Sequence, residues 1–287
     1  MADARVLVTG GSGFVGRQVV AALHRLGADV AELPAPRPDL LTPAGRAEVL
    51  AVAAADTLVH TAWITSPGTY WTSAANLEWV AATLDLAKAF RAAGGRRFVM
   101  VGSCAEYDWQ RPTHSAWRES RACRPRTPYG AAKLLTWAAL LAFARQSGLS
   151  VASARVFVPV GRHEAANRLL PSLIHAALTG TEIATGPAEL TRDFLDVRDA
   201  GEAIARLALS QVRGPVNVGA RRPVTLGRLV DLVPGAAQVV RLGGRLPRAG
   251  EPMWMVPDSR RLRRAIGFTP RYPLDATIAD AIACSAG

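Results

Sequence analysis

Tyr129 and Lys133 lie four residues apart in a segment, about 129–146, whose apolar spacing predicts a helix. At this spacing the two side chains share one helix face. A nearby ammonium group favours the phenolate and lowers the pKa of a tyrosine, so Tyr129 is predicted to exchange a proton near neutral pH. Of the 34 basic residues, only Lys88 and Lys133 are lysines. This scarcity favours a specific role for Lys133 over a chance pairing of a core tyrosine with a surface lysine.

A glycine-rich turn near the N-terminus has the composition of a phosphate site. Residues 6–8 predict a short buried strand, and residues 14–24 predict a helix. The turn contains three evenly spaced glycines: Gly10, Gly13 and Gly16. Glycines let the backbone approach a pyrophosphate closely, and the free N–H groups of a helix N-terminus attract anions. The spacing is one residue longer than the G-x-G-x-x-G fingerprint, so an ordinary strand–helix turn is the alternative.

Strands and helices alternate along the first 158 residues. Further strands are predicted at 28–33, 57–61, 97–101 and 149–158, and helices at 43–54, 73–93 and 129–146. This alternation predicts an α/β fold with a doubly wound parallel sheet. After Pro159 loops are more frequent, with helices at 169–178 and 196–209 and a strand at 216–218. We expect a dinucleotide-binding Rossmann domain of residues 1–158 that also receives about 192–218. Residues 159–191 and 219–287 would form a smaller C-terminal substrate-binding region.

Composition narrows the class of protein. The 287 residues, 49% of them hydrophobic, can bury a large core. No apolar run approaches the ~18 residues of a membrane span, and the first strand leaves no room for a signal peptide. Three cysteines without ligand spacing predict neither a metal site nor a disulfide framework. We therefore expect a soluble cytoplasmic protein. The net charge of +11 comes from scattered arginines, which favours an anionic cofactor and substrate over nucleic acid.

Short motifs follow one another in a fixed order across most of the chain. They are T-G-G-S-G-F-V-G (9–16), D-L (39–40), L-V-H-T-A (58–62), Asn76, G-S-C-A-E-Y (102–107), Y-G-A-A-K (129–133), N-R-L-L-P (167–171), R-D-F-L-D-V (192–197), N-V-G (217–219) and R-A-G-E (248–251). This order resembles that of extended short-chain dehydrogenases/reductases of the NAD-dependent epimerase/dehydratase family. The resemblance implies that Ser103, Tyr129 and Lys133 form the catalytic triad. It also implies that Lys133 holds the nicotinamide ribose.

The same resemblance implies two sets of binding residues. The expected cofactor residues are Gly10, Ser12, Gly13, Phe14, Val15, Gly16, Asp39, Leu40, Thr61, Ala62, Tyr129 and Lys133. The expected residues for a nucleoside-diphosphate sugar are Ser103, Cys104, Asn167, Arg168, Leu169, Arg192 and Arg248. The arginine forks match diphosphate oxygens. The resemblance further implies a homodimer built from the helices near 73–93 and 129–146.

A departure from the family pattern narrows the reaction. Family dehydratases carry an Asp-Glu pair directly after the hydroxyl residue, where this chain has Cys104 and Ala105. Alanine cannot transfer a proton, and Cys104 is expected to be a buried core thiol. Glu106, one place further on, is expected to point away if the chain is still extended there. We expect an NADPH-dependent reduction of a keto group on a nucleoside-diphosphate sugar, in particular a 4-keto-6-deoxyhexose.

A second departure concerns the cofactor. The acidic residue that would hold the adenosine ribose falls at Pro34, and Glu32 lies within the predicted strand. Without a carboxylate a 2′-phosphate meets no repulsion, and Arg37, with help from Arg17, can pair with it. NADP(H) is therefore favoured, with NAD(H) as the alternative.

Other interpretations stay open. A nucleotide-sugar epimerase with tightly held NAD⁺ would use the same triad, because epimerisation is oxidation followed by re-reduction at one carbon. A non-catalytic NADP-binding regulatory protein is the alternative of another class, although the intact Tyr129 and Lys133 count against it. The aromatic loop 63–71 is expected at the ligand edge as a substrate wall, a lid or a dimer contact. His60 is expected to be structural.

Overall fold

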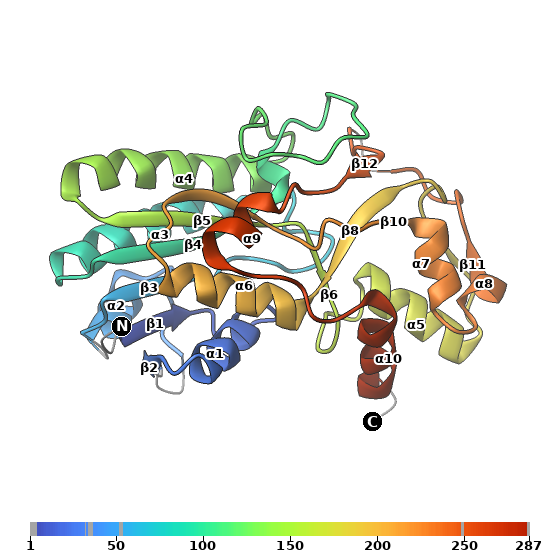
Figure 1. The fold of residues 1–287 in the computed structure, drawn as a ribbon, viewed down its shortest axis with the longest axis horizontal. Coiled ribbons are helices and arrows are strands. Elements are labelled where there is room, and N and C mark those ends of the chain that lie inside the picture. The colour runs from blue at the N-terminus through green and yellow to red at the C-terminus, as the bar shows by residue number, and fades with distance from the viewer. Residues whose placement is uncertain (1–4, 32, 34–36, 52–53, 248–249, 286–287) are drawn as a thin grey trace.

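Six parallel strands form the central sheet of the computed structural model, which describes residues 5–31, 33, 37–51, 54–247 and 250–285. The strands follow the order β2-β1-β3-β4-β5-β9 (Figure 1). Their bounds are β1 Arg5–Thr9, β2 Asp29–Ala31, β3 Thr57–His60, β4 Arg97–Ser103, β5 Ser150–Val156 and β9 Gly214–Val218. The order reverses between β1 and β3, which places the ligand crevice of such a sheet at the carboxyl ends of these strands.

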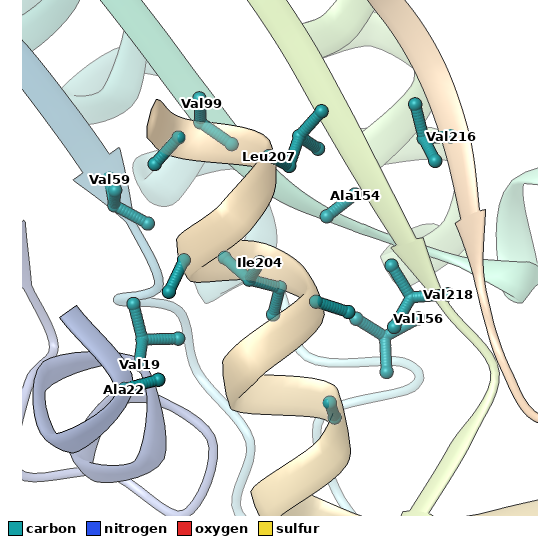
Figure 2. Close-up of a cluster of buried hydrophobic side chains, with 14 of the residues drawn as sticks. Val19, Ala22, Val59, Val99, Ala154, Val156, Ile204, Leu207, Val216 and Val218 are labelled. Atoms are coloured by element: carbon teal, nitrogen blue, oxygen red, sulfur yellow. The ribbon is translucent and has the colours of Figure 1, made fainter. Parts of the chain in front are cut away.

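Helices cover both faces of this sheet. One face carries α1 (Gly16–Arg25), α6 (Val197–Leu209) and α9 (Arg260–Ile266), and the other carries α2 (Pro43–Ala51), α3 (Ala75–Ala92) and α4 (Pro128–Ser147). Alternate strand residues enter opposite cores, because side chains of a strand point to the two faces in turn. In β1, for example, Val6 and Val8 belong to the α1/α6 core and Leu7 to the α3/α4 core. Figure 2 shows Ile204 and Leu207 of α6 within the first of these cores.

A smaller region lies on the right of Figure 1. β6 (Val158–Val160) follows β5 after one residue and pairs with β8 (Thr191–Asp196), so the chain enters this region from the carboxyl end of the main sheet. β8 also pairs with β10 (Pro223–Thr225) and β12 (Trp254–Met255). The remaining elements are α5 Leu169–Thr179, β7 Ile183–Ala184, α7 Leu226–Leu232, α8 Ala236–Val239, β11 Val240–Arg241 and α10 Leu274–Ser285.

The predicted fold class is confirmed: a Rossmann-like parallel sheet is flanked by helices and followed by a smaller C-terminal region. Within residues 192–218, β9 is an edge strand of the main sheet and α6 packs on one face of it, whereas β8 belongs to the smaller sheet. A short 3₁₀ turn, η1 (Cys104–Glu106), follows β4 where the sequence left open an extended chain. Among the described residues, no helix is both long and apolar enough to cross a membrane.

Candidate active site

The glycine turn joins β1 to α1 at the reversal point of the sheet. Gly10 has a positive φ of 72°, and its carbonyl accepts a hydrogen bond of 2.9 Å from the Gly13 N–H group. A Cβ atom at Gly16 would collide with the Gly10 carbonyl, so only glycine fits this close approach. No acidic residue lies in the first turn of α1, and no described side chain caps it. Its N–H groups are thus placed to meet a phosphate.

The other expected cofactor residues surround this turn. The Thr61 hydroxyl donates to the Thr9 carbonyl over 2.7 Å, and a Cβ at Gly10 would touch the Ala62 backbone, so the ends of β1 and β3 are in contact. Arg17 is exposed and donates to the Ser12 carbonyl over 2.8 Å. Arg37 and Asp39 are exposed after β2 and Leu40 is buried, while Phe14 and Val15 are half-buried. Glu32 and Pro34 lie outside the described residues.

Ser103, Tyr129 and Lys133 come from two elements that touch. Ser103 ends β4, and the other two lie in the first turns of α4, where Pro128 begins the helix and Thr127 caps it through a 3.1 Å bond from the Gly130 N–H group. A Cβ at Gly130 would collide with the Ala105 carbonyl, so glycine allows η1 to pack directly on α4. The Ser103 side chain lies close enough to the Tyr129 phenol to act on its pKa. The structure therefore brings the expected triad together.

The electrostatics of this group differ from the expectation in one respect. The Lys133 ammonium lies 3.8 Å from the centre of the Trp63 indole and 5.9 Å from that of the Tyr129 ring, and it donates to the Val101 carbonyl over 2.9 Å. Burial raises the pKa of Tyr129, with Tyr70 acting in the same direction and the Ser103 hydroxyl opposing it. The prediction that the pKa of Tyr129 is lowered overall is therefore wrong in this structure, because desolvation outweighs the interactions that favour the phenolate. Burial also lowers the pKa of Lys133 to about 7.

The aromatic loop 63–71 packs over the ring of Tyr129. Tyr70 and Trp71 meet the Tyr129 ring edge-on, with centroids 4.9 and 5.5 Å away, and the Trp71 carbonyl accepts the Tyr129 N–H group over 3.2 Å. Asn76 fixes the loop, since its amide nitrogen donates to the Tyr70 carbonyl over 2.7 Å and its oxygen accepts from the Trp63 indole over 2.9 Å. The loop thus forms a wall against Tyr129.

Two further titratable groups near the strand ends are structural. The Cys104 thiol is buried, donates to the Phe157 carbonyl over 3.7 Å, and has its pKa raised to about 12 by burial. His60 lies between the hydroxyls of Thr9 and Thr83, at 2.7 and 3.0 Å, and burial lowers its pKa to about 3. Cys104 therefore stays a thiol and His60 stays neutral near neutral pH.

The expected substrate residues differ in how close they lie to Tyr129 and in how exposed they are. Arg168 donates to the Tyr70 hydroxyl over 3.3 Å, which brings its guanidinium to the wall over Tyr129. Asn167 is exposed in front of α5, and Leu169 begins that helix. Arg192 is buried, where it contacts the Glu251 carboxylate at 2.7 Å and two backbone carbonyls, and its charge acts on the Cys104 thiol. Arg248 lies outside the described residues.

Three charged residues that the sequence interpretation did not assign lie close to this group. Glu106 and Arg155 form a buried ion pair of 2.7 Å next to Ser103, and Glu164 lies 3.6 Å from the Arg168 guanidinium. A signal for the pair exists in the sequence, because an arginine inside a strand of seven buried residues requires an acidic partner.

Comparisons with known proteins agree with this geometry. The model of the NAD dependent epimerase/dehydratase family matches residues 6–219. Over 91% of its length the chain is 29% identical to GDP-6-deoxy-D-mannose reductase of Pseudomonas aeruginosa, 85% of which is covered. It is also 29% identical, over 95% of its length, to dTDP-6-deoxy-L-talose 4-dehydrogenase (NAD(P)(+)) of Kitasatospora kifunensis, 93% of which is covered.

Among solved structures, the UDP-glucose 4-epimerase of Thermus thermophilus, in complex with NAD, has the same fold. It superposes with a TM-score of 0.88 at 23% identity, covering 99% of each chain. The family match spans well over half of the chain and includes the glycine turn, Ser103, Tyr129 and Lys133. The protein therefore belongs to the NAD-dependent epimerase/dehydratase family and is an NAD(P)-dependent enzyme of the extended short-chain dehydrogenase/reductase type.

Proposed function

We propose that this protein uses NADPH to reduce the keto group of a nucleoside-diphosphate sugar, in particular the 4-keto group of a 6-deoxyhexose. The observation that carries the proposal is that Ser103, Tyr129 and Lys133 are all present, while the two residues directly after Ser103 are Cys104 and Ala105. Elimination of water needs a further acid and base. A thiol with a pKa of about 12 and an alanine supply neither, whereas reduction needs only one proton donor.

Each of the three residues has its own role in the proposed reduction. When bound, the nicotinamide supplies the hydride. Tyr129 carries its proton near neutral pH, because its pKa is raised, and it donates that proton to the carbonyl oxygen. The Ser103 hydroxyl binds the same oxygen as negative charge develops on it. The Lys133 ammonium stabilises the phenolate that Tyr129 leaves behind, and it holds the ribose hydroxyls.

Support for the substrate comes from the relatives and from the arginines. The names of both similar proteins specify a 6-deoxyhexose linked to a nucleoside diphosphate. Arg168 reaches the wall over Tyr129 through the Tyr70 hydroxyl, where a diphosphate could take its donors bidentately. We assign Arg168 and Asn167 to the diphosphate, and Tyr70 and Trp71 to the wall beside the sugar.

The preference for NADPH is supported by two exposed arginines. Arg17 lies beside the glycine turn, where it donates to the Ser12 carbonyl, and Arg37 follows β2; both side chains are exposed, so a 2′-phosphate can reach them. Replacing Arg37 with alanine is expected to weaken NADPH binding by about tenfold, the loss of one charge-assisted contact, and to leave NADH binding unchanged. Equal changes for the two cofactors, measured by fluorescence titration, would contradict this assignment.

The test of the proposed reaction is a turnover experiment on purified protein. GDP-4-keto-6-deoxymannose and dTDP-4-keto-6-deoxyglucose are each mixed with NADPH, and absorbance and product mass are followed. We expect one NADPH consumed per sugar and a product two mass units heavier, the two added hydrogens of a carbonyl reduction. Absence of NADPH consumption with both sugars would rule out the proposal. Copurifying NAD⁺ with interconversion of UDP-glucose and UDP-galactose would show an epimerase, and tight cofactor binding without turnover a regulatory protein.

We also propose that two copies associate through α3 and α4. These helices pack against each other, and each presents an exposed leucine: Leu77 is 69% exposed and Leu135 58% exposed. A second copy that covered these leucines would remove their apolar surface from water. Replacing Leu135 with glutamate is expected to convert a dimer into monomers in light scattering, and a monomeric wild-type protein would refute the proposal.

A further inference from the structure

Glu106 binds the backbone of Ser103 from inside the protein. Its side chain is 0% exposed, and Oε1 accepts a hydrogen bond of 2.8 Å from the Ser103 N–H group. The Ser103 hydroxyl in turn accepts the Ala105 N–H group over 3.1 Å, so the two side chains cap η1 reciprocally. The second carboxylate oxygen, Oε2, lies 2.7 Å from Nε of Arg155, whose side chain is 3% exposed.

The sheet provides the space and the support for this carboxylate. Gly102 and Arg155 are register partners on β4 and β5, and a Cβ atom at Gly102 would lie only 2.5 Å from Oε1 of Glu106. The glycine directly before Ser103 therefore admits the Glu106 side chain. Arg155 lies 4.7 Å from the Tyr107 ring centre, and the Tyr107 hydroxyl donates to Asn217 of the neighbouring strand over 2.6 Å. One carboxylate oxygen of Glu106 is thus held by the Ser103 N–H group and the other by the Arg155 guanidinium.

Stability alone does not account for such a pair. Two charges lose hydration on burial, and replacing a buried ion pair by apolar residues is often neutral or stabilising. The position of the pair points to another role. Besides its partner Arg155, the titratable groups on which the Glu106 charge acts lie on α4, on its own segment and on the loop before α4: Lys133, Tyr129, Cys104, Tyr107 and Cys123.

We propose that Glu106, held by Arg155, is a positioning residue for the reacting centre: it fixes the main chain of Ser103 and supplies the negative charge that keeps Lys133 an ammonium ion. The inference rests on the proposed roles of Ser103 and Lys133. The charged and titratable groups near Lys133 are Glu106, which favours the ammonium ion, and His60 and Tyr129, which are both neutral near neutral pH. Geometry links the two charges: Lys133 donates to the Val101 carbonyl over 2.9 Å, and Glu106 accepts the N–H group of Ser103, two residues further along the same strand. Burial against the Trp63 ring disfavours the ammonium ion, and the Glu106 carboxylate opposes this effect.

The experiment uses the small number of lysines in the chain. Protein labelled with [¹³C]lysine has only two side chains to resolve, Lys133 and the exposed Lys88. An NMR titration of their ε-carbons reports each ionisation without turnover. Replacing Glu106 with glutamine preserves an oxygen for the Ser103 N–H group and removes the charge. We expect the Lys133 midpoint to fall by about one pH unit, the effect of losing a nearby opposite charge, while Lys88 does not change.

Three further variants make the result unambiguous. Asp199→Asn is the matched control, since Asp199 is another buried carboxylate that accepts backbone N–H groups, of Arg271 and Tyr272, in another part of the fold. It should leave the Lys133 midpoint unchanged. The double variant Glu106→Gln/Arg155→Met removes both charges together and is expected to fold even if the single variant does not. Glu106→Asp keeps the charge and should preserve the midpoint.

Turnover supplies the second readout. In the Glu106→Gln variant we expect the alkaline limb of the kcat profile to shift downwards by the same amount as the Lys133 midpoint. If Glu106 had a purely structural role, its replacement would lower kcat equally at every pH. The Lys133 midpoint and the midpoint of the alkaline limb would then stay in place, and this result would overturn the inference. Wild-type protein that does not reduce a keto sugar would refute the proposed function instead, and the NMR titration would still decide the role of Glu106.

Discussion

The ammonium group of Lys133 lies 3.8 Å from the centre of the Trp63 indole ring. This contact places a cation on an aromatic face at the end of β3, inside the protein, with the Val101 carbonyl as its hydrogen-bond acceptor at 2.9 Å. An aromatic face stabilises the cation less than water does when the site is fully buried, which is why burial lowers the pKa of Lys133 to about 7. A buried cation of this kind opposes the stability of the folded chain.

The stability cost can be measured with the variant Lys133→Met. The pKa of Lys133 is about 7 when folded, against a usual value of 10.5, so the folded chain binds fewer protons between these values. The cost is fully present below pH 7 and disappears as the pH rises towards 10.5. Without cofactor, the variant should be more stable than wild type by about 1–3 kcal/mol at pH 6 and equal to it near pH 10. Lys88→Met is the control, and equal denaturation curves at pH 6 would contradict the prediction.

Removal of the Tyr129 hydroxyl tests the proton donor. Tyr129→Phe keeps the ring that packs against Tyr70 and Trp71, so the fold and the wall should be retained. We expect kcat for keto-sugar reduction to fall by about 10²–10⁴, because the variant lacks the general acid. NADPH binding should change little. Tyr272→Phe, at a more exposed position, is the matched control, and a loss below tenfold in Tyr129→Phe would exclude this role.

The order of the elements was predictable from the sequence because each depends on local patterns. The expected helix at 169–178 is Leu169–Thr179 in the structure, and the expected strand at 57–61 is Thr57–His60. Strand alternation also separates the two cores, as Val6 and Leu7 show. The convergence of Ser103 with Tyr129 follows from the same reasoning, since carboxyl ends of parallel strands meet at one edge.

What the sequence could not supply was the balance between burial and charge. The spacing of Tyr129 and Lys133 correctly predicts one helix face, but the direction of the Tyr129 pKa shift depends on desolvation by a loop some 60 residues away in sequence. The orientation of Glu106 depends on whether the chain continues as a strand after Ser103. It turns into η1 instead, which directs the carboxylate back to the Ser103 N–H group.

Cys104 offers a test of the reaction type. Burial raises the pKa of its thiol to about 12, so it is neither a proton donor nor a nucleophile near neutral pH. Cys104→Ala should keep kcat for reduction within about threefold, because the loss of one buried sulfur atom alters packing but leaves the proton donor in place. In native protein, iodoacetamide should leave Cys104 unmodified, and the half-buried Cys284 provides the comparison. A loss above about 100-fold would make the thiol a participant.

The buried carboxyl group of Glu164 lies next to Arg168, an arginine that we assign to the substrate. Its side chain is 4% exposed, one oxygen lies 3.6 Å from the Arg168 guanidinium, and the other has no hydrogen-bond partner among the described residues. Burial raises the pKa of Glu164 from 4.5 to about 7. The folded chain therefore binds this proton more tightly than the unfolded chain does. Stability falls as the pH rises from about 4.5 to 7, and the full cost remains above pH 7.

The variant Glu164→Gln mimics the protonated carboxyl at every pH. It should be more stable than wild type by about 1–2 kcal/mol at pH 8 and equal to it at pH 4.5, measured by thermal unfolding at both values. Glu182→Gln, at an exposed position, is the control. Above pH 7 the ionised Glu164 also repels a diphosphate beside Arg168, so KM for the sugar nucleotide should rise with pH in wild type and stay level in the variant. A KM that rises equally in both would place Glu164 away from the substrate.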